Sequence, residues 1–304
     1  MKREPFIFFN KSLILSLVLA TFTSVAHAGP IVYALTGSNQ FGTIDLATGA
    51  FHQTGTSYTP PDGGGLAAGP NGTLLSMSFA GKLYSVNSAT GATTLIGPTG
   101  LGNCTLTTDP CGPNPANVLG TFGGHQYATD FANNLYSVNP VTGHATLIGA
   151  TGIPGLPFIP LSDNPDGSFN FYDENLFSAG GNLYANFDAA TFNPTTSALT
   201  TLIADALYRI DPLSGHATFI APTDIGLSAI VSVGGTVYAF SGATNQIFTL
   251  NLANGQTTLV SNLDPAAGLI VGAVATPEPG SVVLSLLGIV GIAVGKRRGQ
   301  LAVR

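Results

Sequence analysis

The chain has 304 residues and a formal net charge of −6, with 8% charged and 44% hydrophobic residues. The hydrophobic fraction excludes an intrinsically disordered chain, because such chains lack the apolar surface that offsets the entropy lost on folding. The acidic balance argues against a nucleic-acid partner, whose phosphates it would repel. Abundant Gly and Pro, with β-branched and aromatic residues alternating between turn residues, indicate an all-β protein.

Residues 1–28 are typical of a secretory signal peptide. Basic residues at the start precede an apolar run at 12–20, and two small residues, Ala26 and Ala28, stand just before Gly29. Small residues at these places suit signal peptidase, so we expect cleavage before Gly29 and export of the rest. An uncleaved N-terminal anchor is the alternative, although the apolar run is shorter than the ~20 residues that span a bilayer.

One hairpin-like segment then recurs in five copies. The copies are "FGTIDLATGAFHQTG" (41–55), "LYSVNSATGATTLIG" (83–97), "LYSVNPVTGHATLIG" (135–149), "LYRIDPLSGHATFIA" (207–221) and "IFTLNLANGQTTLVS" (247–261). Each copy has Asp or Asn at the start of a turn and Gly four residues later. The Asp or Asn side chain accepts hydrogen bonds from the turn backbone, and Gly takes the positive φ that closes it. The pattern predicts five β-hairpins with equivalent turns.

Two more strand-like segments precede each of the last four copies, which gives each unit four short strands. Their innermost segments are 65–70, 118–124, 175–181 and 227–235. Four antiparallel strands repeated about every 40–50 residues predict the blades of a β-propeller. The repeats resemble the "LYxIDPxTGxATxIG" propeller repeats of exported bacterial proteins of unknown role.

The first unit lacks its innermost strand, and the segment 268–275 offers one at the other end of the repeats. If that strand joins the first blade, the ring closes without an open edge. We therefore predict a propeller of five four-stranded blades in a domain of residues 29–275. A six-bladed ring with a degenerate blade hidden in residues 150–206 and a pair of β-sandwiches are the alternatives.

Three segments stand outside the repeats, at 97–116, 151–174 and 189–206, and we expect loops there. The first contains Cys104 and Cys111, which predict a local disulfide because the chain is exported and its cysteine count is even. The second contains "DNPDGSFNFYDEN" (163–175), the densest group of oxygen ligands in the sequence. Its candidate Ca²⁺ ligands are Asp163, Asp166, Asn170, Asp173 and Glu174. The spacing does not match an EF-hand loop, and a solvated loop between blades is the alternative.

The C-terminal residues 276–304 have three parts in a distinctive order. The motif Pro277, Glu278 and Pro279 comes first, an apolar run at 281–295 follows, and the basic residues Lys296, Arg297 and Arg298 come last. This order resembles the PEP-CTERM sorting signal. The resemblance implies processing near the motif by an exosortase, at the surface of a Gram-negative bacterium that makes exopolysaccharide. The run predicts one transmembrane helix with the basic cluster in the cytoplasm, and a plain C-terminal anchor is the alternative.

The sequence favours a binding or structural module over an enzyme. Residues 29–279 hold two basic residues against twelve Asp and two Glu, a net charge of −12. The expected partners are exopolysaccharide or surface proteins, besides the processing enzymes, and no cofactor other than a possible Ca²⁺ is predicted. A propeller enzyme of lyase, lactonase or glycosidase type is the alternative, but the predicted inner strands are small and apolar. Asp130 and Asp188 are the remaining candidates for an acid at the channel mouth, and no catalytic residue is assigned.

Overall fold

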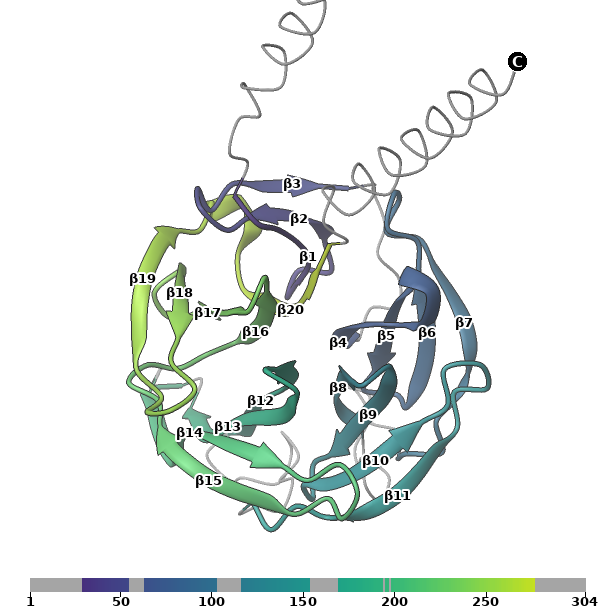
Figure 1. The fold of residues 1–304 in the computed structure, drawn as a ribbon. Helices are drawn as coiled ribbons and strands as arrows, with labels where there is room; N and C mark the ends of the chain where they lie inside the picture. Colours follow the sequence, from purple (N-terminus) through teal and green to yellow (C-terminus); the bar gives the residue numbers. More distant parts are fainter. Residues whose placement is uncertain are drawn as a thin grey trace, which may run out of the picture.

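Five four-stranded antiparallel sheets surround a central axis in the computed structural model of the chain (Figure 1). The structure describes residues 29–54, 63–102, 116–153, 169–193, 195–196 and 198–276. Each sheet is one blade of a β-propeller, so the predicted five-bladed ring is confirmed. Within the described ranges there is no sixth sheet, and the six-bladed and sandwich alternatives are wrong.

The strands of each blade follow one another outward from the axis (Figure 1). The inner strands of blades 1 to 5 are β20 (Ile270–Ala275), β4 (Gly63–Ala68), β8 (Ala116–Phe122), β12 (Phe169–Ala179) and β16 (Ala229–Val233). The second strands, in the same order, are β1 (Ile31–Thr36), β5 (Leu74–Ser78), β9 (His125–Asp130), β13 (Asn182–Asn193) and β17 (Thr236–Ser241). The third strands are β2 (Phe41–Asp45), β6 (Lys82–Val86), β10 (Asn134–Val138), β14 (Ala198–Ile210) and β18 (Gln246–Leu250). The outer strands are β3 (Phe51–Gln53), β7 (Thr93–Pro98), β11 (Ala145–Ala150), β15 (Ala217–Pro222) and β19 (Thr257–Asn262), and two 3-10 helices are η1 (Pro70–Gly72) and η2 (Pro265–Ala267).

The ring closes as the sequence predicts, by pairing strands from the two ends of the described chain. Strand β20 pairs antiparallel with β1, in a register that sets Val32 opposite Ala275 and Ala34 opposite Ala273. Blade 1 therefore takes its inner strand from the C-terminal side of the propeller and its other strands from the N-terminal side. Blade 1 thereby has four strands like the other blades, and one sheet holds both ends of the described chain together.

The repeated hairpins form the third and outer strands, and their turns have the predicted geometry. In the copy at 135–149, the Asn139 side chain accepts hydrogen bonds from Val141 N at 2.8 Å and Thr142 N at 3.1 Å. Gly143 has φ +83° and donates from its N–H to Asn139 O at 2.8 Å. The same backbone bond and a positive φ at Gly occur in all five copies. The Asx–Gly signature thus predicts the turns correctly.

Apolar side chains pack between neighbouring blades, in five clusters among the described residues, each drawn from two blades. Between blades 3 and 4, Leu135 and Tyr127 pack with Leu183 and Phe187, all of them buried. Burying a Leu or Phe side chain contributes roughly 1.5–3 kcal/mol. The apolar positions of the repeat therefore hold each blade to the next.

The hairpin turns also join the blades at the rim. Each turn packs against the end of the preceding blade's outer strand, and Ala145 N donates to Thr99 O at 2.8 Å, as Ala217 N does to Thr151 O. A Cβ atom on Gly143 would lie 2.7 Å from Gly97 O. Glycine is therefore needed in this turn for the close approach of two backbones as well as for its φ.

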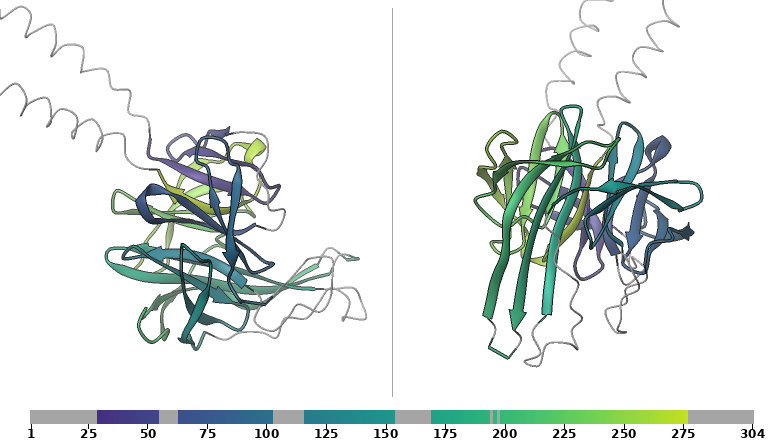
Figure 2. Two further views of the ribbon diagram at one scale, coloured as in Figure 1. Left: turned by 90° about the vertical axis from the view of Figure 1, so that its right-hand side faces the viewer. Right: turned by 90° about the horizontal axis from the view of Figure 1, so that it is seen from below.

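Blade 4 is larger than the others because β12, β13 and β14 have 11, 12 and 13 residues. The prediction of loops at 151–174 and 189–206 is wrong in part, since residues 169–174 begin β12 and residues 189–193 and 198–206 continue β13 and β14. The extra length extends the sheet beyond the ring on one side (Figure 2). The region in which the six-bladed alternative placed a degenerate blade therefore contains an extended hairpin.

The ring has two distinct faces. The loop face is the end at which the inner strands begin, and strands β4, β8 and β12, which follow residues 55–62, 103–115 and 154–168, all start there. The extended β13–β14 hairpin of blade 4 projects from the same face (Figure 2). The terminal face is the opposite end, where the described chain begins at Gly29 and ends at Thr276, whose hydroxyl donates to Ile31 O at 2.8 Å.

Several predicted features lie outside the described residues. They are the signal peptide at 1–28, the cysteines Cys104 and Cys111, and the sorting signal from Pro277 onward. Within the described part of the chain, no helix has the length and apolar content needed to cross a bilayer.

Candidate functional site

The loop-face end of blade 4 carries a group of polar side chains. We call it the blade 4 polar cluster, and its members are Glu174, Asn175, Asn186, Asp188 and Asp205. Successive residues of a strand point to opposite sides of a sheet. Because blade 4 is packed between blades 3 and 5, the cluster is divided between two blade junctions.

Glu174 points toward blade 3. Its side chain is only 7% exposed, and its Oε2 accepts a hydrogen bond of 2.8 Å from the hydroxyl of Thr129, which is fully buried in β9. An acid on an inner strand contradicts the expectation that these strands are small and apolar. The expectation failed because the sequence reading started the strand at Asn175, one residue too late to include this carboxyl.

Asn175 and Asn186 lie opposite each other on β12 and β13 and point toward blade 5. The amide of Asn175 donates to Leu227 O, in the segment that leads into blade 5, at 3.1 Å. The amide of Asn186 is fully buried and donates to Asp205 Oδ1 at 3.1 Å and to Ala206 O at 3.3 Å. These bonds tie the inner three strands of blade 4 to the start of blade 5.

Asp205 occupies a β-bulge of β14. Phe187 pairs with Ala206 and Ala189 with Ile203, so that Asp188 stands opposite two residues, Ala204 and Asp205. Such bulges re-aim side chains and are common beside functional sites. Here the bulge directs Asp205 into the junction with blade 5.

The Asp205 carboxyl is buried enough to change its acidity. Burial raises its pKa to about 6, against the opposing effect of hydrogen bonds from Asn186, Thr223 and the backbone of Leu227. A charged group loses hydration when it leaves water, which favours the protonated acid. Asp205 therefore changes charge near neutral pH.

Comparison among the blades shows that Asp205 is exceptional. The equivalent positions, two residues before the first Leu, Phe or Ile of each repeat hairpin, are Asn39, Gly81, Asn133 and Asn245. These four residues have positive φ, as suits a tight turn between second and third strands. In blades 2 to 5 the backbone carbonyl at this position accepts a hydrogen bond from the chain just after the outer strand. Blade 4 is the only one of the five described blades with a carboxylate at this position between the second and third strands.

Asp130, one of the two acids expected at the channel mouth, has a structural role. It is fully buried and accepts hydrogen bonds from Asn134 N at 2.9 Å and from Tyr136 OH at 2.8 Å. Thr36 and Ser78 accept from the backbone at the same place in blades 1 and 2. Burial and then the hydrogen bond to Asp130 raise the pKa of Tyr136. The other candidate, Asp188, is partly buried and belongs to the polar cluster.

Of the predicted Ca²⁺ ligands, the structure describes only the side chain of Glu174, which points toward blade 3. Asp163 and Asp166 lie outside the described residues, while Asn170 and Asp173 lie on β12. The sequence reading missed Asn186 and Asp205, which alignment of the internal repeats at the second and third strands could have found.

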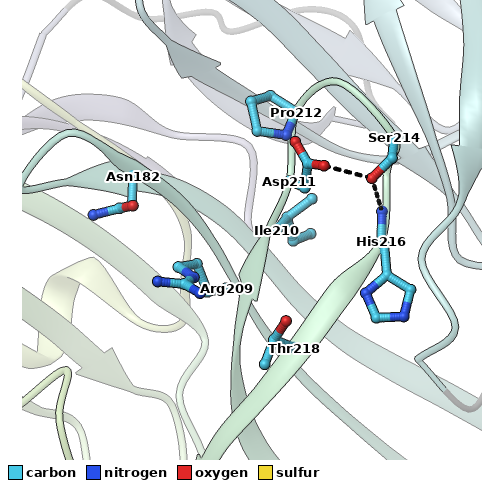
Figure 3. Close-up of a pocket in the computed structure, with 8 residues that line it drawn as sticks. All are labelled: Asn182, Arg209, Ile210, Asp211, Pro212, Ser214, His216 and Thr218. Atoms are coloured by element: carbon cyan, nitrogen blue, oxygen red, sulfur yellow. Dashed lines mark hydrogen bonds between the residues drawn. The ribbon is translucent and has the colours of Figure 1, made fainter.

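A shallow pocket of about 540 Å³ lies at the rim of blade 4 (Figure 3). Asp211, Ser214 and His216 line it, but they do not form a catalytic triad. The hydroxyl of Ser214 donates to Asp211 Oδ2 at 2.6 Å, and His216 approaches Ser214 Oγ only through its backbone N–H, at 3.3 Å. Figure 3 shows the imidazole turned away from both. These residues form the turn of the repeated hairpin. The hydrogen bond from the Ser214 hydroxyl lowers the pKa of Asp211 most, and the bonds from the backbone N–H groups of Leu213 and Ser214 lower it further.

Comparisons with known proteins give only distant structural matches. No protein family and no curated protein sequence matches the chain. Among solved structures, a nidogen/laminin complex has a chain 13% identical, with a TM-score of 0.46 over 82% of this chain and 98% of that one. The PQQ-bound aldose sugar dehydrogenase of Streptomyces coelicolor is 14% identical, with a TM-score of 0.39 over 75% and 87%. Virginiamycin B lyase of Staphylococcus aureus is 12% identical, with a TM-score of 0.35 over 72% and 66%. At such distance fold does not imply function.

Proposed function

We propose that this chain is an exported PEP-CTERM protein whose five-bladed propeller is a binding module at the surface of a Gram-negative bacterium. Signal peptidase would cut before Gly29, and an exosortase would process the chain near Pro277, Glu278 and Pro279. The expected partners are exopolysaccharide or other surface proteins. The sequence signals at both ends support export, and the propeller supplies a rigid frame for binding loops.

The main support for the proposal is that the ends of the described chain lie on one face of the ring, whereas the strands that follow the unrepeated segments begin at the other face. Gly29 and Thr276 both lie at the terminal face, so the predicted membrane segment at 281–295 would continue from that side. The strands that follow the unrepeated segments begin at the loop face, from which the β13–β14 hairpin also projects (Figure 2). Until processing near Pro279 removes that segment, a membrane tether on one face leaves the other face directed away from the membrane. Such an arrangement suits recognition of a partner outside the cell.

The sorting part of the proposal is tested by mass spectrometry of the protein recovered from outside the cytoplasm. We expect a C-terminus near Pro279. Recovery of peptides containing Lys296, Arg297 and Arg298 outside the cytoplasm would contradict exosortase processing.

The binding part is tested with two matched variants and the extracellular polysaccharide of the producing strain. Thr195→Arg alters an exposed residue at the tip of the loop-face hairpin, and Thr90→Arg alters an exposed residue in a turn of the terminal face. We expect the first change to weaken retention on immobilised polysaccharide at least tenfold and the second to leave it unchanged. Equal effects of the two changes would refute binding through the loop face.

A secreted enzyme of lyase, lactonase or glycosidase type is the second candidate, and the buried Glu174 on an inner strand favours it. A carboxyl group is one of the side chains that serve in general acid catalysis. Incubation of the polysaccharide with the protein and with Glu174→Gln discriminates the two functions. Product release that depends on Glu174 would establish catalysis, whereas binding without product release supports the module.

A further inference from the structure

We propose that blade 4 holds a Ca²⁺ ion at its junction with blade 5, with Asp188, Asp205 and the side-chain oxygen of Asn186 as protein ligands. This set is different from the ligands that the sequence suggested at 163–175. The site would lie where the second and third strands of the blade approach the loop face. It does not depend on the proposed export or on the choice between binding and catalysis.

Two strands of blade 4 bring a pair of carboxyl-bearing residues opposite each other. Asp188 on β13 stands opposite the bulge of β14 that contains Asp205. Residues directly opposite across two strands have Cβ atoms about 4.5–5.5 Å apart, and like charges at such places are destabilising. A pair of acids across two strands is therefore a place where a cation would relieve repulsion.

Asn186 supplies independent evidence that this pair has a ligand. It lies two residues before Asp188 on the same side of β13 and is 0% exposed. Its Nδ2 donates to Asp205 Oδ1 at 3.1 Å, which sets the amide against the acidic pair. Among the described residues, its Oδ1 is buried and accepts no hydrogen bond. Buried polar atoms are almost always bonded, so this oxygen calls for a partner at the cluster.

The chemistry of the ligands selects the metal. Asp188, Asp205 and Asn186 offer oxygen atoms only, whereas zinc sites favour His and Cys. Ca²⁺ accepts six to eight oxygen ligands from carboxylates, amides and waters with flexible geometry. Among the described side chains no three His, Cys, Asp or Glu converge, so two carboxylates, the amide and water would complete the shell. The partial exposure of Asp188 and Asp205 leaves the ion a route from solvent.

The experiment measures thermal unfolding of the full chain in EDTA, in Ca²⁺ and in Mg²⁺, with calorimetric titration of Ca²⁺ beside it. At Ca²⁺ a hundred times above Kd, we expect Tm to rise by roughly 5–10 °C over the EDTA value. Mg²⁺ should raise Tm less, because it demands a stricter octahedral shell. Absence of both a Tm rise and a heat of binding would overturn the proposal, and an equal rise with Mg²⁺ would overturn the choice of Ca²⁺.

Two variants locate the ion. Asp188→Asn should reduce the Ca²⁺-dependent rise in Tm at least by half, while Asp45→Asn should retain it. Asp45 is a matched control because it lies in an exposed turn at which three other copies have Asn. If Asp188→Asn does not fold, titration of Asp205→Asn gives the same information, since its carbonyl oxygen still accepts the bonds of the junction. A full Ca²⁺ response in either cluster variant would refute the site.

Discussion

The two ends of blade 4 differ in how closely they match the corresponding parts of the other blades. Its hairpin at 207–221 has four copies elsewhere, and its turn packs on blade 3 as the other turns pack on their neighbours. Its loop-face end has a bulge in β14 and a carboxylate, Asp205, at a position where the other blades have Asn or Gly. This difference indicates that the repeated residues build the ring. A functional role is then to be sought where the residues of one blade differ from those of the other blades.

The largest effect is expected at a repeated junction, with Gly143→Ala. The alanine would need φ near +83°, and its Cβ would lie 2.7 Å from Gly97 O of the preceding blade. Left-handed strain and the backbone clash together should reduce the free energy of unfolding by about 3–4 kcal/mol. Urea denaturation of the full chain measures the loss.

Gly124→Ala is the matched control for this junction. Gly124 has φ +80°, and a Cβ there would meet nothing within 4 Å. We expect a loss of only about 1–2 kcal/mol, from the backbone strain alone. Similar losses for the two variants would show that the turn glycines do not act through contact between blades.

A smaller effect is expected at the unique end, and it depends on pH. The pKa of Asp205 is about 6 in the folded chain, above the ordinary 3.8, because of burial. The folded state therefore binds the proton more tightly, so stability is greatest below pH 4 and falls as pH rises through 6. Ionisation of this group should lower the free energy of unfolding by about 2 kcal/mol between pH 4 and pH 7.

Asp205→Asn isolates this contribution, because asparagine cannot ionise and matches the residue found at the same position in three other blades. Urea denaturation in EDTA should show the variant gaining about 2 kcal/mol on the natural chain between pH 4 and pH 7. A constant difference over this range would mean that Asp205 is hydrated like a surface acid, and the distinction between the two ends of the blade would weaken.

The parts of the fold that recur were predictable from the sequence. Because one hairpin occurs in five copies, its turn and its two strands could be identified by comparing the copies. The same comparison showed that the first unit lacks an inner strand. The segments at 163–174 and 189–206 have no copy, and their Asp and Asn residues suggested loops. Alternation of Phe169 and Phe171, and of Leu199 with later apolar residues, was present but too short to outweigh the polar residues.

The candidate site was less predictable, because it depends on contacts between strands distant in sequence. Asn186 and Asp205 meet only through the bulge in β14, which no local pattern announces. Glu174 was noted as an oxygen ligand, but its burial against Thr129 follows from the packing of blade 3 on blade 4. Internal alignment could have singled out Asp205, since Asn or Gly stands at that position in every other blade.

The smallest effect tests how interchangeable the repeated turns are. Asn139→Ala removes the acceptor for Val141 N and Thr142 N at an exposed turn, and we expect a loss of about 1 kcal/mol in the free energy of unfolding. Asn139→Asp should stay within about 0.5 kcal/mol of the natural chain, because Asp45 and Asp211 make the same bonds in their own turns. Urea denaturation compares the three proteins. If Asn139→Asp lowered the free energy of unfolding as much as Asn139→Ala, each turn would be specific to its own blade. A difference in sequence from the other blades would then no longer distinguish the loop-face end of blade 4.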